Sequence, residues 1–445
     1  MLLTLLSLHA FAGGDLAMPY QIHTLDNGLT VILAEDHRTD TVALHVRYDV
    51  GAKDERDGEY GCAHLFEHLM FEGSANVPGN SFDTWLTAAG GENNAWTSED
   101  ETAYHMTFPS GALDVALFLE SDRMGFLREG LTAENLANQQ SVVVQERYRY
   151  YDAPNGQDYD ALTVLLYPPE HPYGHTVLGP VAQVQGFTED GVHAFWERNY
   201  KPGNAVLSLV GNIEPEQALG RLRYWFSDVA DRGAGEPILE FPEPPSTQAL
   251  GVMEDEVEER TLYLSWPTVP TGHPDEPALD LLASILSDGR GTRLDDELYY
   301  DRQLATSTSA WASANTLSGY FLVEASVARL KLPKLEKEIH RVLDGLQTAA
   351  VTEAELDRAR RSLRSSMLDH IETPQGRAGA LVACYVTTGE ADCLDADWAR
   401  YQAVTPADIS RVAATWLTPE RQVSLSVIPN GDKGALPGAQ VVVLP

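Results

Sequence analysis

The sequence predicts an α+β fold built from two homologous domains, each a mostly antiparallel sheet with helices packed on it. Three observations support this prediction. Both halves of the chain mix strands of alternating apolar residues with helical patterns, a segment rich in Gly, Pro and Glu separates the halves, and one stretch recurs at a constant offset. At 445 residues the chain is long enough for two domains, each with a core of its own.

The first half opens with strand patterns. Residues 25–36, LDNGLTVILAED, carry an Asn-Gly hairpin signal, and residues 41–50, TVALHVRYDV, alternate apolar side chains on one face. Helical periodicity follows in four segments, residues 112–127, 132–151, 334–349 and 352–372. We therefore expect both halves to combine strands and helices without strict alternation.

A repeat relates the two halves. Residues 188–212, TEDGVHAFWERNYKPGNAVLSLVGN, match residues 405–430, TPADISRVAATWLTPERQVSLSVIPN, in a Thr, a helical pattern, a Pro and a closing strand. The threonines are 405 − 188 = 217 positions apart and the prolines 419 − 202 = 217. Two equal offsets indicate duplication. The segment 231–247, DRGAGEPILEFPEPPST, fits neither helix nor strand. We therefore place a first domain at 18–232, a linker at 233–247 and a second domain at 248–445.

The N-terminal segment resembles a secretory signal. Residues 1–12 are mostly apolar and end in Ala10, Phe11 and Ala12, which satisfies the small-x-small rule for cleavage. This run is too short for a permanent anchor, and no later segment approaches the ~20 apolar residues of a membrane span. We expect an exported protein, periplasmic or secreted, without a membrane span.

The charge balance excludes one class of partner. The chain has 31 Lys and Arg against 66 Asp and Glu, a net charge of −35. Such a charge repels nucleic acid, so we expect no nucleic-acid partner. The acidic surface either serves solubility or attracts basic peptides, and the composition does not separate these alternatives.

Three cysteines are too few for a disulfide scaffold. Cys384 and Cys393 lie close enough in sequence to bridge in an oxidising compartment, which leaves Cys62 alone. They form no paired CxxC spacing, which argues against a zinc site built on cysteine.

Residues 61–74, GCAHLFEHLMFEGS, place three polar groups in an apolar helical run. His64 and His68 are four apart, so on a helix they share one face and can offer two nitrogens to one metal ion. Glu67 lies near the same face. The alternative is a pair of satisfied core histidines with a glutamate that reaches solvent. Burying all three groups unpaired would cost several kcal/mol, so the spacing favours a metal site.

The order His-x-x-Glu-His is the inverted zincin signature. With it, the chain resembles the pitrilysin or insulinase family of zinc metallopeptidases, in a bacterial short form similar to processing peptidases. The resemblance continues in GGENNAWTSEDETAYHMTFP, NQQSVVVQERYRYYDAPNGQ and LYPPEHPYGHTVLG. It implies a zinc-dependent endopeptidase whose catalytic domain is 18–232, with a second, metal-free homologous domain at 248–445.

The resemblance also implies roles for single residues. His64 and His68 would be zinc ligands, Glu146 on a later helix the third ligand, and Glu67 the catalytic base. Without the resemblance, Glu146 would be read as a solvent-facing glutamate beside Arg147. Gln139 lies two helical turns before Glu146 and would support the ligands from outside.

A peptide substrate would be held as an extra strand at a sheet edge. The stretch NNAWTSEDETAY resembles the edge strand of the family, which implies backbone contacts at Asn94 and Ala95. The alternative for Asn93 and Asn94 is an ordinary turn after Gly90 and Gly91.

The second half departs from the pattern of active family members. Its segment PALDLLASILSDG contains no histidine, so we expect one zinc per chain. Tyr299 and Thr306 occupy the positions where many active relatives carry an Arg and a Tyr that grip the substrate, and Arg302 is nearby but out of register. The resemblance then implies a partner: a second family subunit that supplies the Arg/Tyr pair, or a homodimer.

We therefore expect the metal-bearing subunit of a heterodimer that encloses peptides or unfolded segments between two half-shells. The main alternative is a non-catalytic structural or assembly subunit of the same family. An exported acidic binding protein with incidental histidines is a third hypothesis, which leaves the motif and the repeat unexplained.

Overall fold

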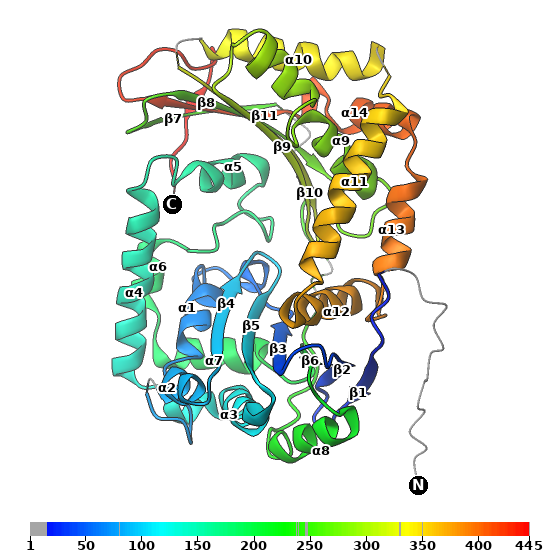
Figure 1. Cartoon of the computed structure of the whole chain (residues 1–445). Helices are drawn as coiled ribbons and strands as arrows, with labels where there is room; N and C mark the ends of the chain where they lie inside the picture. Colours follow the sequence, from blue (N-terminus) through cyan, green and yellow to red (C-terminus); the bar gives the residue numbers. More distant parts are fainter. Residues whose placement is uncertain are drawn as a thin grey trace. The chain divides into compact units, whose positions relative to one another are not determined.

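The computed structural model describes residues 16–79, 81–236, 238, 240–244, 248–328, 331–348 and 350–444 (Figure 1). The predicted signal segment, residues 1–12, lies outside the described residues, as does part of the predicted linker 233–247. Within the described ranges, no helix combines the length and apolar character needed to cross a membrane.

The chain forms two compact units, each with one six-stranded sheet and helices packed on it. The first unit comprises the described residues of Met1–Val142, Val181–Pro237 and Ser366–Trp398, and the second those of Val143–Pro180, Ile238–Ser365 and Ala399–Pro445. The predicted α+β class with two domains is confirmed.

The first sheet has the order β1-β2-β6-β3-β5-β4. Its strands are β1 (Gln21–Thr24), β2 (Thr30–Glu35), β3 (Thr41–Tyr48), β4 (Glu92–Thr97), β5 (Thr102–Pro109) and β6 (Ala205–Gly211). Only β2 and β6 pair in parallel. The Asn-Gly signal does close a hairpin between β1 and β2, with Gly28 at φ 89°, a region that suits glycine. Strand β4 pairs only with β5 and forms an edge of the sheet.

The second sheet has the order β12-β7-β11-β8-β10-β9. Its strands are β7 (Ala249–Asp255), β8 (Arg260–Thr268), β9 (Ser307–Ala314), β10 (Gly319–Val327), β11 (Val423–Pro429) and β12 (Gln440–Val441). The strand order β7-β11-β8-β10-β9 matches the order β2-β6-β3-β5-β4 of the first sheet. Strands β7 and β11 are parallel, as β2 and β6 are. Five strands of each sheet therefore share one topology, as the repeat predicts, and the sixth differs, since β1 is antiparallel to β2 and β12 is parallel to β7.

The repeated threonines have the same structural role. Thr188 is the N-cap of α7 (Glu189–Asn199), where its side chain accepts a hydrogen bond from the Gly191 N–H. Thr405 caps α14 (Pro406–Trp416) by accepting from the Asp408 N–H. Each satisfies a backbone donor that the first turn of a helix leaves without a partner. The duplication thus preserves the local signal that starts this helix.

Helices cover both sheets. Those that lie in the first unit or begin there are η1 (Ala52–Asp54), α1 (Cys62–Leu69), α2 (Ser81–Ala88), η2 (Ser110–Ala112), α3 (Leu113–Gly130), α4 (Ala133–Tyr151), α6 (Val181–Gly186), α7, α8 (Pro215–Trp225), α12 (Pro374–Thr388) and α13 (Leu394–Ala403). The others are α5 (Asp158–Leu166), α9 (Glu276–Leu286), the π-helical turn η3 (Asp295–Asp301), α10 (Leu332–Thr348), α11 (Glu353–His370), α14 and η4 (Pro419–Arg421).

Two helices of the repeat are exchanged between the units. Helix α5, from the first half of the sequence, packs on β7, β8 and β11, and the Tyr263 hydroxyl donates to Asp158 Oδ2 at 2.6 Å. Helix α12, from the second half, packs on β3 and β6. Their first residues are 374 − 158 = 216 positions apart, close to the repeat offset. The compact units therefore differ from the sequence division 18–232 and 248–445, which stays a prediction about the duplicated sequence.

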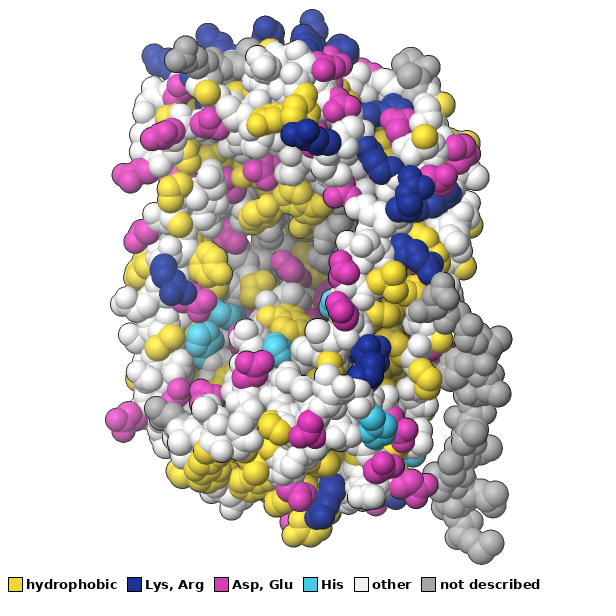
Figure 2. Space-filling view, in the orientation of Figure 1, with side chains coloured by type: hydrophobic (Ala, Val, Ile, Leu, Met, Phe, Trp, Pro, Cys, Tyr) yellow, Lys and Arg dark blue, Asp and Glu magenta, His cyan; other side chains and the backbone are white. Residues whose placement is uncertain are grey.

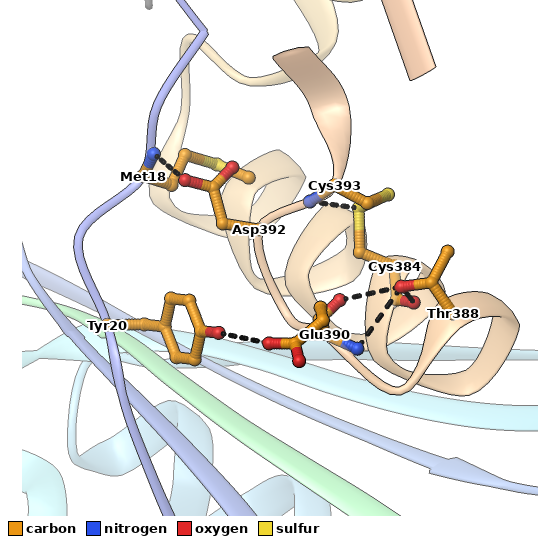
Figure 3. The surroundings of a disulfide bond; sticks show 7 residues. All are labelled: Met18, Tyr20, Cys384, Thr388, Glu390, Asp392 and Cys393. Carbon is orange, nitrogen blue, oxygen red and sulfur yellow. Dashed lines mark hydrogen bonds between the residues drawn. A yellow bond between two sulfur atoms is a disulfide. The ribbon is translucent and has the colours of Figure 1, made fainter. Parts of the chain in front are cut away.

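A disulfide joins Cys384 and Cys393, as the sequence allows, and Cys62 is a free, buried cysteine. The loop that this disulfide closes holds the segment before β1 (Figure 3): the Met18 N–H donates to Asp392 Oδ2 at 3.0 Å, and the Tyr20 hydroxyl donates to Glu390 Oε2 at 3.3 Å. The bridge thereby connects the end of α12 to the beginning of the first sheet.

We predict that replacing both bridged cysteines, Cys384→Ala with Cys393→Ala, destabilises the first unit. A loop with a sequence separation of 9 corresponds to about 2 to 3 kcal/mol of lost chain entropy in the unfolded state. Thermal unfolding should begin several degrees lower, and hydrogen exchange at residues 18–20 should speed up. Unchanged unfolding and exchange would show that the bridge does not constrain this unit.

Candidate metal centre

Helix α1 carries both histidines of the motif. His64 is buried and His68 half-buried, and their ring centroids lie 4.9 Å apart in an edge-to-face arrangement. The remaining side chains of the helix are mostly buried apolar groups, with Leu65, Phe66 and Leu69 fully enclosed. The four-residue spacing therefore aims two imidazoles at one place, as expected for i and i+4 on a helix.

Glu146 meets these histidines from α4. One ligand atom each of His64, His68 and Glu146 lie within 4.8 Å of one another, and this is the only such group of three or more His, Cys, Asp or Glu among the described residues. Helix α4 runs without interruption from Ala133, so Glu146 is fixed by the same helix that carries Gln139. Two imidazoles and one carboxylate form a ligand set typical of catalytic zinc.

The neighbour of Glu146 has contacts elsewhere in the chain. Arg147 is buried, donates from Nη1 to the Gly179 carbonyl at 2.6 Å and lies over the Tyr151 ring, 4.2 Å from its centroid. Glu146 itself is half-buried. A half-buried carboxylate differs from the solvent-facing glutamate beside Arg147 that the sequence alone would suggest, and the role of Glu146 as a ligand stays a prediction.

The electrostatic surroundings of His64 suit a metal ligand. Burial, together with the neighbouring His68, lowers the pKa of His64 to about 3. The ring is therefore neutral across the physiological range, and neutral imidazole is the form that binds a metal.

Glu67 lies on α1 between the two histidines and outside the three-residue cluster. Its Oε2 accepts a hydrogen bond of 2.8 Å from the Thr97 hydroxyl, and both side chains are half-buried. The helix that carries two members of the cluster thus also carries a carboxylate outside it, and the role of Glu67 as a base stays a prediction.

The edge strand β4 carries the predicted peptide contacts. Asn94 and Ala95 lie in this strand, opposite His105 and Tyr104 of β5. Asn93 and Asn94 are therefore strand residues, and the alternative of a turn there is wrong. The Ala95 N–H donates to Asn94 Oδ1 at 2.9 Å. Whether these residues contact a substrate stays a prediction.

Gln139 is buried, and its side chain reaches Glu72 rather than any ligand that the structure describes. Its Nε2 donates to Glu72 Oε1 at 2.5 Å, and Asn135 of the same helix donates to the Glu72 carbonyl at 2.9 Å. Both contacts attach α4 to the segment that follows α1, so Gln139 helps to set the distance between the two helices that carry the cluster.

Sequence reasoning missed two residues that support α1 and β4. Glu55 is buried and accepts from the Gly61 N–H at 2.9 Å and from the Ala63 N–H at 2.7 Å, so it caps the start of α1. Burial raises the pKa of Glu55, and the two N–H bonds oppose that rise. Lys53 is also buried. Burial alone would lower its pKa, but Asp54 and Asp49 raise it. No local sequence signal indicates this cap, because Glu55 lies seven residues before the helix begins at Cys62.

The residues singled out in the second half have other partners. Arg302 pairs with Glu338, with Nη2 donating to Oε1 at 3.0 Å, and Thr306 donates to Glu259 Oε2 at 2.6 Å. Tyr299 is exposed on η3. Helix α9, which packs on β9 as α1 packs on β4, buries Leu279, Leu282 and Ile285 and carries no histidine.

Known protein families match both parts of the chain. The family model described as insulinase, peptidase family M16, matches residues 30–167, and the model described as peptidase M16 inactive domain matches residues 186–363. The chain belongs to the insulinase family.

Relatives of this family span nearly the whole chain. The zinc protease PqqE of Helicobacter pylori is 27% identical over 398 residues, which cover 88% of this chain and 88% of that protein. The uncharacterized zinc protease YmxG of Bacillus subtilis is 24% identical over 92% of this chain and 98% of its own length.

Solved structures share the fold. A protease from Helicobacter pylori superposes with a TM-score of 0.83 at 25% identity, covering 93% of this chain and all of that one. A peptidase M16 inactive domain from Pseudomonas fluorescens gives 0.84 at 21% identity over 94% of this chain and 100% of its own, a likeness of fold alone.

We predict that Glu55→Ala destabilises the first unit by about 1 to 3 kcal/mol, because two buried N–H groups at the start of α1 lose their acceptor. The urea concentration at the midpoint of unfolding should be lower for this variant than for the unmodified chain. Glu92→Ala, an exposed position of β4, provides the control and should stay within about 0.5 kcal/mol of the unmodified chain. Equal shifts for both variants would refute the capping role.

Proposed function

We propose that this protein is a zinc-dependent endopeptidase. The observation that carries the proposal is the convergence of His64, His68 and Glu146 within 4.8 Å, with Glu67 on the same helix as the histidines. The names of the relatives, zinc proteases, agree with this chemistry.

The residues fit one zinc ion per chain. His64 and His68 would hold it through ring nitrogens and Glu146 through a carboxylate oxygen, which leaves a position open for reaction, as catalytic zinc requires. When bound, zinc polarises the scissile carbonyl and makes water acidic enough to react near neutral pH.

Glu67 performs the proton transfer in this proposal. Its carboxylate lies beside the cluster and accepts a proton from the attacking water, then delivers it to the nitrogen of the leaving amine as the C–N bond breaks. The Thr97 hydroxyl donates to Oε2 of this carboxylate.

Strand β4 holds the substrate. Its outer edge pairs with no described strand, and a peptide added there is held extended by backbone hydrogen bonds. The Ala95 N–H would exchange its bond to Asn94 Oδ1 for one to the peptide. The face shown in Figure 2 carries both acidic and basic side chains, and it is the net charge of −35 that favours basic peptides.

We predict that Glu67→Gln keeps zinc and loses at least about 100-fold in kcat, because an amide cannot accept the proton. The unmodified chain and the variant would each be incubated with a mixed peptide library, alone and in the assembly that gives turnover, with products identified by mass spectrometry alongside zinc content. A Glu67→Gln variant that cleaves at the unmodified rate would exclude Glu67 as the base.

We further propose that a second subunit completes the active enzyme. Tyr299 and Thr306 stand where many active relatives have Arg and Tyr, and the nearby Arg302 is engaged by Glu338. A partner of the same family could supply the missing pair, and a homodimer is the alternative. A non-catalytic assembly subunit is the second candidate function, which the same missing pair favours.

Peptidase activity with and without the second subunit tests the need for a partner. The chain alone should bind zinc and show little turnover, and turnover should rise when the second subunit is added. Light scattering during gel filtration would report the assembly state. Full activity as a monomer would contradict the partner. Zinc binding without turnover in every assembly would support the non-catalytic alternative.

Export from the cytoplasm is part of the proposal. The disulfide between Cys384 and Cys393 requires oxidising conditions to persist. Together with the apolar N-terminal segment, it supports a periplasmic or secreted location.

A further inference from the structure

Thr97 connects the proposed base to the strand that would hold the peptide. It is the last residue of β4, and its hydroxyl donates to Glu67 Oε2 at 2.8 Å. The bond joins two elements that are 97 − 67 = 30 residues apart in sequence. The length of the Thr97–Glu67 hydrogen bond therefore depends on how α1 and β4 are held relative to each other.

Residues 52–55 hold the turn that follows Thr97. The Ala52 N–H donates to the Ser98 carbonyl at 3.0 Å and the Lys53 N–H to the Glu99 carbonyl at 2.9 Å. The Lys53 ammonium donates to the Asp100 carbonyl at 2.7 Å. Glycine at position 51 lets residues 51–53 lie close to this turn. A Cβ at that position would lie 2.5 Å from the Glu99 carbonyl oxygen, which is too close.

The same short segment holds the start of α1. Glu55 accepts from the backbone N–H groups of Gly61 and Ala63, directly before His64. Residues 52–55 therefore contact both the β4–β5 turn and the helix that carries Glu67. Buried hydrogen bonds at both ends make this segment a spacer between the base and the strand.

A hydrogen bond to one carboxylate oxygen restricts rotation of the Glu67 side chain. The bond engages Oε2 and links the carboxylate to the end of β4. Catalytic groups have to be held within a fraction of an ångström of their working position, and a misplacement of about 1 Å can cost about 100-fold in rate. Without the hydroxyl, this restraint on the carboxylate is lost.

We propose that Thr97 is a positioning residue for Glu67, so that the strand which receives the peptide also orients the base. This inference rests on the proposed peptidase function for its effect on rate, but its effect on the Glu67 side chain is independent of turnover. Residues 52–55 set the spacing on which the Thr97–Glu67 bond depends.

Three variants test the proposal. Thr97→Val removes the hydroxyl and keeps the shape, Thr97→Ser keeps a hydroxyl, and Thr107→Val is the control. Thr107 is a half-buried threonine on the neighbouring strand β5, where it pairs with Glu92 at the opposite end of β4 from Thr97. We would measure kcat, KM, zinc content and the unfolding midpoint of each variant. Crystallography would give the orientation of the Glu67 side chain.

Thr97→Val should lose about 10- to 100-fold in kcat, with KM, zinc content and unfolding midpoint unchanged, and its Glu67 should rotate or occupy two conformers. Thr97→Ser should recover most of the rate, and Thr107→Val should match the unmodified chain. An unmoved Glu67 in Thr97→Val overturns the proposal whatever the activity. A loss of kcat that accompanies loss of zinc or of stability overturns it as well.

The outcome for the proposed function is separate. If the unmodified chain binds zinc and cleaves no peptide in any assembly, the peptidase proposal fails. The positioning role of Thr97 is then decided by the orientation of Glu67 alone.

Discussion

The burial of helix α1 is the constraint on which the rest of the site depends. The helix is short and mostly apolar, yet it carries His64, Glu67 and His68 in and beside the core. Polar groups in such a place are costly unless each has a partner. Glu146 from α4 and Thr97 from β4 lie where those partners are needed. The positions of α4 and β4 are thus coupled to the chemistry of three side chains on one helix.

The supporting contacts explain why a helix of two turns can hold this arrangement. An isolated helix of this length would not be stable in water. Here Glu55 satisfies backbone donors at its start, Gln139 attaches α4 to Glu72 after its end, and Lys53 secures the adjacent turn. These contacts come from residues 53–55 and from Gln139, which are distant in sequence from each other, so the support of α1 depends on tertiary structure.

Local features were predictable from the sequence, and distant contacts were not. The His-x-x-Glu-His spacing lies within one helix, and the repeat predicted two sheets of one topology, because Thr188 and Thr405 start equivalent helices. Glu146 required the family resemblance, since nothing near it in sequence indicates a ligand. The exchange of α5 and α12 escaped prediction because an amphipathic pattern shows that a helix packs on a sheet without showing which one. Thr97 and Glu55 escaped because ordinary residues acquire their roles from long-range hydrogen bonds.

The most direct test of the account is to locate zinc in crystals of the purified protein by anomalous diffraction at the zinc absorption edge. The account predicts one anomalous peak per chain, bonded to His64, His68 and Glu146 at zinc–nitrogen and zinc–oxygen distances of about 2.0 to 2.2 Å. A peak at another set of residues, or no peak after crystals are supplied with zinc, would contradict it.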